Sequence, residues 1–150
     1  IEDTVASLLV KDDPRIVSVN LPESNVLVRV DAEKLRQALT NLLSNAYKYS
    51  PKGGAIELDC VHAESHAGKQ IGIRICDHGI GMTPEQLSRA FERFYRADSS
   101  GNIPGTGLGL CLVKEIVELQ GGKIDMESAF GQGTTVTLWL PLPDAALAAA

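Results

Sequence analysis

The chain has 150 residues, of which 44% are hydrophobic and 22% charged, with a formal net charge of −5 at pH 7 and an isoelectric point near 5.1. This balance is typical of one globular domain, and the acidic charge argues against a nucleic-acid surface, so that a polyanionic ligand would need local Lys, Arg or a metal ion. No apolar run is long enough for a membrane span, and three cysteines without a Cys-x-x-Cys pair indicate a reducing compartment. We therefore expect a soluble, cytoplasmic, monomeric domain. Because the chain begins at Ile1 rather than methionine, we also expect a piece of a longer protein.

Hydrophobic periodicity predicts both helices and strands along the chain. Helical patterns cover residues 1–9, 31–49, 84–94 and 108–120. Strand patterns cover residues 15–20, 25–30, 55–62, 70–76, 123–127 and 134–140, the first two as a hairpin-like pair. These strands outnumber the crossovers that a parallel α/β sheet needs, so we predict an α+β two-layer sandwich, with about three helices on one face of a mixed, mainly antiparallel sheet. The domain is expected to span residues 1–142 and to end in a disordered tail, 143–150.

The predicted helix over residues 31–49 carries a polar face as well as an apolar one. Asn41, Asn45 and Lys48 fall within an arc of roughly 60°, and the apolar positions centre roughly 140° away. Such a face can simply be solvated, but two asparagines one turn apart lower the helix propensity. We favour a ligand-binding role, in which the amide oxygens suit Mg²⁺ and Lys48 suits phosphate oxygens.

The stretch CDHGIGM follows the predicted strand over residues 70–76. Gly79 and Gly81 let the chain turn away tightly after Asp77, and an aspartate beside two glycines is commonly only a turn. In the alternative interpretation Asp77, held against apolar Ile75 and Ile80, accepts a hydrogen bond from the amino group of a flat ligand. Adenine carries an amino group where guanine has a carbonyl oxygen, so this carboxylate would select adenine.

The stretch PGTGLGLCLV places Gly105, Gly107 and Gly109 at the start of a predicted helix. Glycine permits close approach of the backbone, and free N–H groups at a helix N-terminus favour an anion. The spacing does not fit the dinucleotide fingerprint, because Leu110 stands where the third glycine would be, and no Gly-Lys pair precedes Ser or Thr as in a P-loop. Spacing alone therefore leaves open a phosphate loop of another kind and a flexible hinge.

Five ordered motifs resemble those of bacterial sensor histidine kinases. They are NLLSNAYKYS, DHGIGM, FERFYR, GTGLGL and GQGT, and they resemble the N box, first glycine box, F box, second glycine box and glycine-threonine turn. The resemblance covers residues 1–142 and implies the Bergerat ATP-binding fold, with a five-stranded sheet. It also implies that GTGLGL is the hinge and phosphate-binding turn of an ATP lid.

The resemblance further implies a role for each matching residue. Asn45 would be the Mg²⁺ ligand, with Asn41 beside it and Lys48 at the phosphates as the other catalytic positions. Asp77 would bind the adenine amino group, and either Arg93 or Arg96 would bring positive charge to the triphosphate. The full set of implied nucleotide-binding residues is Tyr49, Asp77, Gly79, Gly81, Phe94, Tyr95, Arg96, Gly105, Thr106, Gly107, Leu108, Gly109, Leu110 and Thr134.

The implied reaction is transfer of the γ-phosphoryl group of Mg-ATP to a histidine on a separate dimerisation and phosphoacceptor domain. Hydrolytic members of the superfamily have a water-activating Glu at the position of Asn41, and an amide cannot take a proton, so we expect poor hydrolysis. A response regulator downstream and a membrane-bound homodimeric parent protein are the implied partners and context. The alternatives are a hydrolytic ATPase and a nucleotide-sensing module that only docks to a partner.

Overall fold

The computed structural model describes residues 17–23, 26–66, 68–98 and 100–143. Within them the chain forms five strands and three helices. In chain order these are β1 (Val17–Asn20), α2 (Ala32–Lys48), β2 (Ile56–Ser65), β3 (Gly68–Asp77), α3 (Pro84–Ser88), α4 (Gly109–Leu119), β4 (Lys123–Ala129) and β5 (Gly133–Pro141). The predicted helix over residues 1–9 and the tail beyond residue 143 lie outside the described residues.

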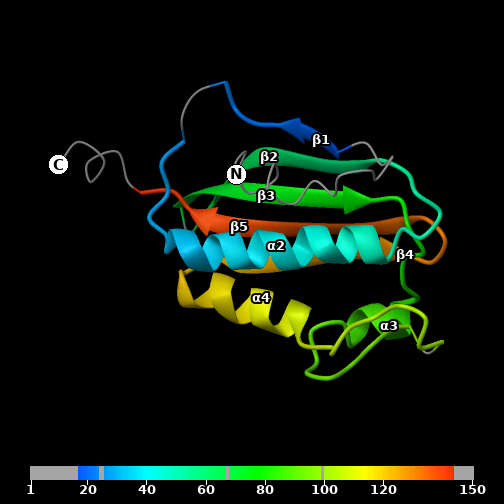
Figure 1. Cartoon of the computed structure of the whole chain (residues 1–150). Coiled ribbons are helices and arrows are strands. Elements are labelled where there is room, and N and C mark those ends of the chain that lie inside the picture. Colours follow the sequence, from blue (N-terminus) through cyan, green and yellow to red (C-terminus); the bar gives the residue numbers. More distant parts are fainter. Residues whose placement is uncertain (1–16, 24–25, 67, 99, 144–150) are drawn as a thin grey trace.

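The five strands form one sheet in the order β1-β2-β3-β5-β4. β1 pairs with β2 in parallel and every other pair is antiparallel, which confirms the mixed, mainly antiparallel sheet. Helices α2 and α4 lie side by side over one face of the sheet, and α3 lies beyond the N-terminal end of α4 (Figure 1). The α+β two-layer architecture is therefore as predicted.

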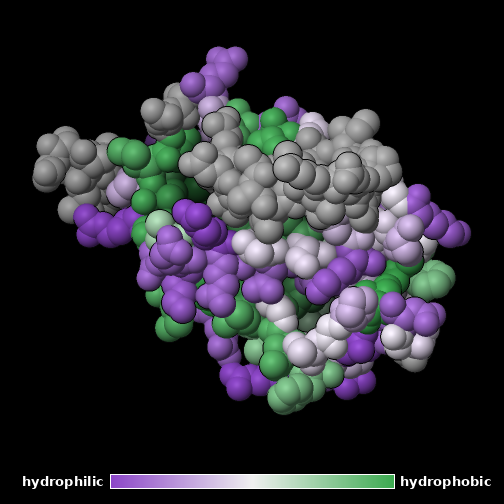
Figure 2. Space-filling model, in the orientation of Figure 1, coloured by the Kyte–Doolittle hydropathy of each residue, from purple (hydrophilic) through white to green (hydrophobic). Residues whose placement is uncertain are grey.

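Helix α2 forms where the sequence predicts it. The Asp31 carboxylate accepts a hydrogen bond from the Lys34 N–H at 3.1 Å, which caps one of the free donors of the first turn. The outer face of α2 is covered mainly by hydrophilic side chains (Figure 2). The opposite face packs against the sheet through Ala38, Leu39, Leu42, Leu43 and Ala46, all of which are buried.

The predicted hairpin at the start of the chain is wrong. β1 pairs with β2, starting at Val17 opposite Ile56, and residues 26–30 form no strand. Val26, Val28 and Val30 instead pack against the core as the chain runs to the start of α2. Alternate burial of valines produces the same pattern as a half-buried strand, whether or not the backbone is paired.

The predicted helix over residues 84–94 is too long. Thr83 caps α3 with a reciprocal capping box to Gln86, as expected for a helix that starts at Pro84, but α3 ends at Ser88. Beyond it the backbone makes successive tight turns, and Phe94 has a positive φ of 65°. That conformation cannot continue a right-handed helix.

Candidate functional site

A cavity of about 300 Å³ opens between α2, the ends of β3 and β5, and the segment that joins α3 to α4. Its walls differ in character from one end to the other. The sheet end contains Asp77 among apolar side chains, and the other end contains the amides of α2 beside the glycine loop. Residues lining the sheet end include Ile75, Asp77, Ile80, Met82, Met126, Thr134 and Val136.

Asp77 is the charged group of the sheet end and is only 7% exposed. Its Oδ1 accepts the Gly79 N–H at 2.9 Å and the Thr134 N–H at 3.3 Å. Burial raises the pKa of this carboxyl, and the two backbone hydrogen bonds oppose that shift. Both of these hydrogen bonds end on Oδ1. Among the described residues none donates to Oδ2, so this oxygen can accept a hydrogen bond from a ligand.

The turn after Asp77 is packed backbone against backbone. A Cβ atom at Gly79 would lie 1.9 Å from the Tyr49 carbonyl oxygen, and one at Gly81 would lie 2.0 Å from the Ala129 carbonyl oxygen. Gly81 also has a positive φ of 62°. No side chain fits at either position, so these glycines shape the site by allowing close approach.

The polar face of α2 borders the other end of the cavity. Asn41, Asn45 and Lys48 all line it, the two asparagines half-buried and Lys48 exposed. The Asn41 amide donates to the Gln37 carbonyl oxygen at 3.2 Å, and a Cβ atom at Gly109 would lie 3.5 Å from Asn41 Oδ1. The start of α4 therefore lies against the asparagine face of α2.

Helix α4 begins without a side-chain cap, because its N-cap residue, Leu108, provides no such hydrogen bond. Gly109 and Leu110 in its first turn line the cavity. The free N–H groups of such a turn attract an anion. The uncapped start of α4 thus lies beside the Asn41 amide oxygen of α2.

The glycine loop is joined to the segment after α3 by its backbone. The Phe94 N–H donates to the Gly107 carbonyl oxygen at 3.0 Å, and a Cβ atom at Gly107 would lie 2.7 Å from the Phe94 carbonyl carbon. The Phe94 side chain points to solvent and is 74% exposed. The following residues, Tyr95 and Arg96, do line the cavity.

The two arginines that the sequence could not distinguish have different positions. Arg93 forms an ion pair with Glu115 on α4, and its side chain is 66% exposed. Arg96 lines the cavity, and its Nε is buried with no hydrogen-bond partner in the described chain. Of these two arginines, Arg96 is therefore the one that lines the cavity, and its guanidinium also donates to the Ile103 carbonyl oxygen.

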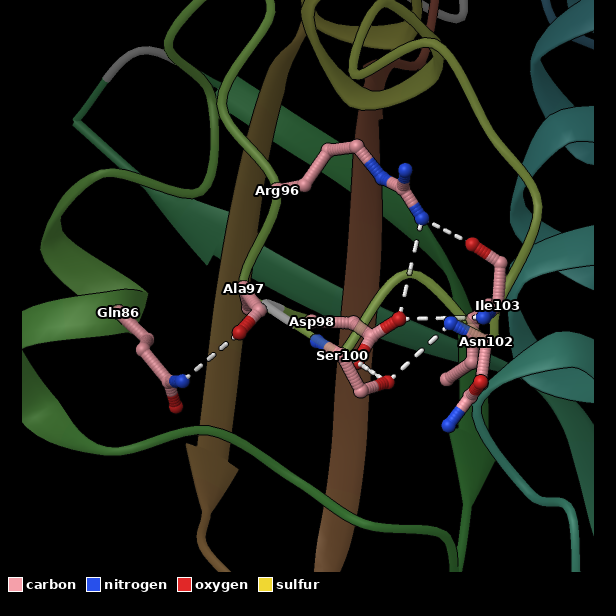
Figure 3. A network of polar contacts seen from close by, with 7 residues as sticks. All are labelled: Gln86, Arg96, Ala97, Asp98, Ser100, Asn102 and Ile103. Carbon is pink, nitrogen blue, oxygen red and sulfur yellow. Dashed lines mark hydrogen bonds and ion pairs between the residues drawn. The ribbon is translucent and has the colours of Figure 1, made fainter.

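The loop from Arg96 to Ile103 is held together by Asp98 (Figure 3). The Asp98 carboxylate accepts hydrogen bonds from the Ser100 hydroxyl and N–H and from the Ile103 N–H, and it lies 3.8 Å from the Arg96 guanidinium. The pKa of Asp98 is lowered from its ordinary value. The Ser100 hydroxyl is the main cause, followed by the Ile103 and Ser100 N–H groups and the positive charge of Arg96. Gln86 of α3 joins this network by donating to the Ala97 carbonyl oxygen at 3.0 Å.

A family model described as histidine kinase-, DNA gyrase B- and HSP90-like ATPase matches residues 30–144. The chain belongs to this ATPase family. It is 40% identical over 124 residues to the sensor histidine kinase WalK of Bacillus subtilis (strain 168), a match that covers 81% of this chain and 20% of WalK. The chain spans about a fifth of the length of the curated relatives it matches.

Solved structures of sensor kinases have the same fold. The mycobacterial sensor histidine kinase MprB matches with a TM-score of 0.77 and 28% identity, over 94% of this chain and 91% of that chain. The histidine kinase domain of the E. coli osmosensor EnvZ matches with a TM-score of 0.67 and 27% identity, over 95% of this chain and 83% of that chain. Together with the family match, these relatives identify the chain as an ATP-binding domain of the histidine kinase type.

Most of the site residues expected from the sequence line the cavity of this ATPase-family domain. These are Asn41, Asn45, Lys48, Tyr49, Asp77, Gly81, Tyr95, Arg96, Gly105, Thr106, Gly107, Gly109, Leu110 and Thr134. Three others do not line it: Gly79, Phe94 and Leu108. Gly79 supports Asp77 through its N–H, Phe94 bonds to Gly107 through its backbone, and Leu108 starts α4.

Sequence reasoning missed Ser128, which does not line the cavity but forms hydrogen bonds with Met82 and Thr134, two residues that do. Its hydroxyl accepts the Met82 N–H at 2.9 Å, and lies 2.9 Å from both the Gly133 carbonyl oxygen and the Thr134 hydroxyl. The signal was present in β4, where Met126 and Ser128 share the inward face at a spacing of two. A serine in that position needs polar partners.

Within residues 17–23, 26–66, 68–98 and 100–143, no helix has the length and apolar character required to cross a membrane.

Proposed function

We propose that this domain binds Mg-ATP in the cavity and donates the γ-phosphoryl group to a histidine on a separate dimerisation and phosphoacceptor domain. The observation that carries the proposal is the meeting of three elements at one cavity. Asp77 lies at one end, and the asparagine face of α2 and the start of α4 lie at the other. This arrangement suits a ligand with a flat amino-bearing base and a polyanionic tail.

The adenine end is formed by Asp77 and its apolar neighbours. Asp77 Oδ2 would accept from the adenine amino group while Ile75 and Met82 contact the ring. Thr134 would support the base from β5, since its N–H already fixes Asp77 and its hydroxyl is held by Ser128. Tyr49, which is half-buried and lines the same cavity, would pack near the base or the ribose.

The residues at the phosphate end fit a bound magnesium ion. Asn45 presents an amide, a hard oxygen ligand, and Asn41 lies beside it on the same helix face. Magnesium, when bound, neutralises part of the triphosphate charge. Lys48, Arg96 and the N–H groups of the first turn of α4 would bind the remaining phosphate oxygens.

The residues of this chain support phosphoryl transfer by positioning rather than by proton removal. Asn41 cannot act as a general base, so water in the cavity would not be activated by it. The chain's histidines lie in β2, in the turn after it and after β3, and none lies on a helix. The acceptor would therefore be a histidine of another domain, whose ring nitrogen forms the N–P bond as the bond to the leaving ADP breaks.

The rest of the proposal concerns the longer protein. The dimerisation and phosphoacceptor helices would belong to the same protein, and a response regulator would receive the phosphoryl group afterwards. We also propose that residues 1–142 form the domain, on the cytoplasmic side of a membrane-bound homodimeric parent. The sensor kinase relatives, of which this chain spans about a fifth, support the presence of other domains in the same protein.

Radiolabelled ATP tests the proposed reaction. Three samples are compared: this chain alone, the chain with the histidine-bearing domain of its parent protein, and the Asn45→Ala variant with that domain. We expect acid-labile label on the added domain only with the unaltered chain, and a loss of at least about 100-fold with Asn45→Ala, because the triphosphate charge is then poorly neutralised. Asn20→Ala, an exposed asparagine on β1, is the matched control and should transfer normally.

Each alternative function has its own outcome in this experiment. Rapid phosphate release by the chain alone would support a hydrolytic ATPase. ATP binding without any transfer to the added domain would support a nucleotide-sensing module. Either result would overturn the proposed kinase reaction.

A further inference from the structure

A second group of chemically reactive side chains lies close to the ATP cavity but outside it. Glu57 of β2 is paired directly with Cys76 of β3, and His78 follows immediately after β3. Side chains alternate across a strand, so Cys76 lies on the opposite face of the sheet from Ile75 and Asp77, which are buried. Neither Glu57, Cys76 nor His78 lines the ATP cavity.

The three side chains present their donor atoms to one another. One carboxylate oxygen of Glu57, the Cys76 sulfur and one ring nitrogen of His78 all lie within 4.8 Å of each other. His78 Nε2 and Glu57 Oε1 are 3.4 Å apart. Oxygen and nitrogen ligands of a tetrahedral zinc ion lie about 2.0 to 2.1 Å from the metal and hence about 3.3 Å from each other. Two of the three ligands therefore already have the spacing of a zinc site.

We propose that Glu57, Cys76 and His78 bind a thiophilic divalent cation, Zn²⁺, on the sheet face opposite α2 and α4. A set of one sulfur, one nitrogen and one oxygen donor suits Zn²⁺, whereas Mg²⁺ prefers oxygen ligands in octahedral geometry. Binding forms the Zn–S bond and releases the thiol proton to solvent. Three protein ligands leave the fourth position for water or another small ligand.

The surrounding charges permit a cation. Arg74, two residues before Cys76 on the same strand face, is the nearest positive group of β3. Its guanidinium is bound in a two-pronged ion pair by Asp59, with Nε 2.8 Å from Oδ1. The positive charge of Arg74 is thereby matched, and Glu57 adds a negative charge at the site itself.

The position of the site has a structural consequence. Cys76 and His78 flank Asp77, whose carboxylate faces the ATP cavity on the other side of the sheet. A bound ion would tie both flanks of Asp77 to Glu57 on β2. The metal site and the adenine end of the ATP cavity thus share one backbone turn, although metal binding does not depend on the proposed kinase function.

Cobalt and zinc binding to the tag-free, reduced chain tests this site without nucleotide. We expect one Co²⁺ ion per chain, with a near-ultraviolet thiolate-to-cobalt absorption band that Zn²⁺ abolishes by displacement. The Zn²⁺ Kd from calorimetric titration should lie below about 10 μM. Zinc should also raise the Tm of the chain by several degrees, because a ligand that binds only the folded state stabilises it.

Matched variants identify the ligands. Cys76→Ser should remove the absorption band, and His78→Gln and Glu57→Gln should each weaken Zn²⁺ binding at least about tenfold. Cys60→Ser and His62→Gln alter another half-buried thiol and another exposed imidazole, both on β2, and should leave binding unchanged. Since the His78 side chain is 52% exposed, His78→Gln provides a test even if Cys76→Ser should fail to fold.

Two results would overturn the site. One is the absence of one-to-one Zn²⁺ binding with a Kd below about 10 μM. The other is binding that persists in both Cys76→Ser and His78→Gln, or that is lost equally in the two control variants.

Discussion

The two ends of the ATP cavity are held by different kinds of contact. At the adenine end, Gly79, Gly81 and Gly133 bring backbone against backbone so closely that an added Cβ atom would lie 1.9 to 2.0 Å from a carbonyl oxygen. At the lid end, the segment from Arg96 to Ile103 is held by hydrogen bonds around Asp98. In contrast, Gly101 in this segment and Gly105 just after it have open space around them. A Cβ atom added at either glycine would have no atom of the described chain within 4 Å, other than those of its chain neighbours.

This contrast predicts that the two ends of the cavity differ in mobility. Close-packed backbone has little room to move, so we expect the end around Asp77 to keep one conformation with and without a ligand. The segment around Asp98 is held instead by a few local hydrogen bonds, so we expect it to open at a lower free-energy cost than the close-packed turn. The predictions below test the contrast, from the largest expected effect to the smallest.

The largest effect should come from adding one methyl group at the adenine end. Gly81→Ala would place a Cβ atom 2.0 Å from the Ala129 carbonyl oxygen, so we expect destabilisation of more than about 4 kcal/mol, or failure to fold. Gly101→Ala is the matched control, because its φ of 73° resembles the 62° of Gly81 but its surroundings are open. It should cost only about 1 to 2 kcal/mol. Urea denaturation measures both, and equal losses would contradict the contrast.

Asp77→Asn should change the base preference while preserving the fold. The oxygen of the new amide can still accept hydrogen bonds from the Gly79 and Thr134 N–H groups. The NH₂ group that replaces Oδ2 is a donor, however, and would face the adenine amino group, which is also a donor. We expect ATP binding to weaken about tenfold to a hundredfold, as expected for loss of a charge-assisted hydrogen bond of about 1.5 to 3 kcal/mol. GTP binding should not weaken.

Stability provides the control for that variant. Burial raises the pKa of the Asp77 carboxyl, which means that its ionised form is disfavoured in the folded chain. Replacing it with a neutral amide should therefore leave the Tm at neutral pH unchanged or slightly higher. Calorimetry gives both the nucleotide affinities and the Tm, and unchanged ATP affinity in the folded variant would refute the role of Asp77.

Hydrogen exchange should separate the two ends directly. Without nucleotide, amides of residues 100–105 should exchange at least about 100-fold faster than those of residues 73–77, because no side chain of residues 100–105 is buried, whereas alternate side chains of residues 73–77 are. A non-hydrolysable ATP analogue should slow exchange in the lid by ordering it. Equal and strong protection of the lid with and without nucleotide would contradict this prediction.

The smallest effect should come from Asp98→Ala, which removes the centre of the lid network. We expect faster exchange in residues 100–103 and little change in global stability, because these hydrogen bonds join only local groups. The pKa of Asp98 is lowered in the folded chain, so its contribution is fully present above the ordinary Asp range and is lost as the pH falls through the lowered value. Exchange measured at two acidic pH values would detect that loss.

Local sequence patterns were sufficient to predict those elements whose formation depends mainly on their own residues. The spacing of the apolar positions and the Asp31 cap predicted α2, and Thr83 and Pro84 predicted the start of α3. The two residues Asn41 and Asn45 were assigned to one face by helix geometry alone, and both line the cavity. The family motifs implied a lid and an adenine end, and most of the residues they name line the cavity.

Tertiary structure decided what depends on residues far apart in the chain. The alternate valines before α2 could not show that residues 26–30 stay unpaired, because burial against the core and burial in a sheet give the same periodicity. Likewise, nothing in the sequence distinguished Arg93 from Arg96, since their positions depend on how the segment after α3 folds back over the cavity. The register of β2 against β3 is also what brings Glu57 beside Cys76, 19 positions later in the sequence. Periodicity reports which side of an element is buried, but only packing reports what lies on that side.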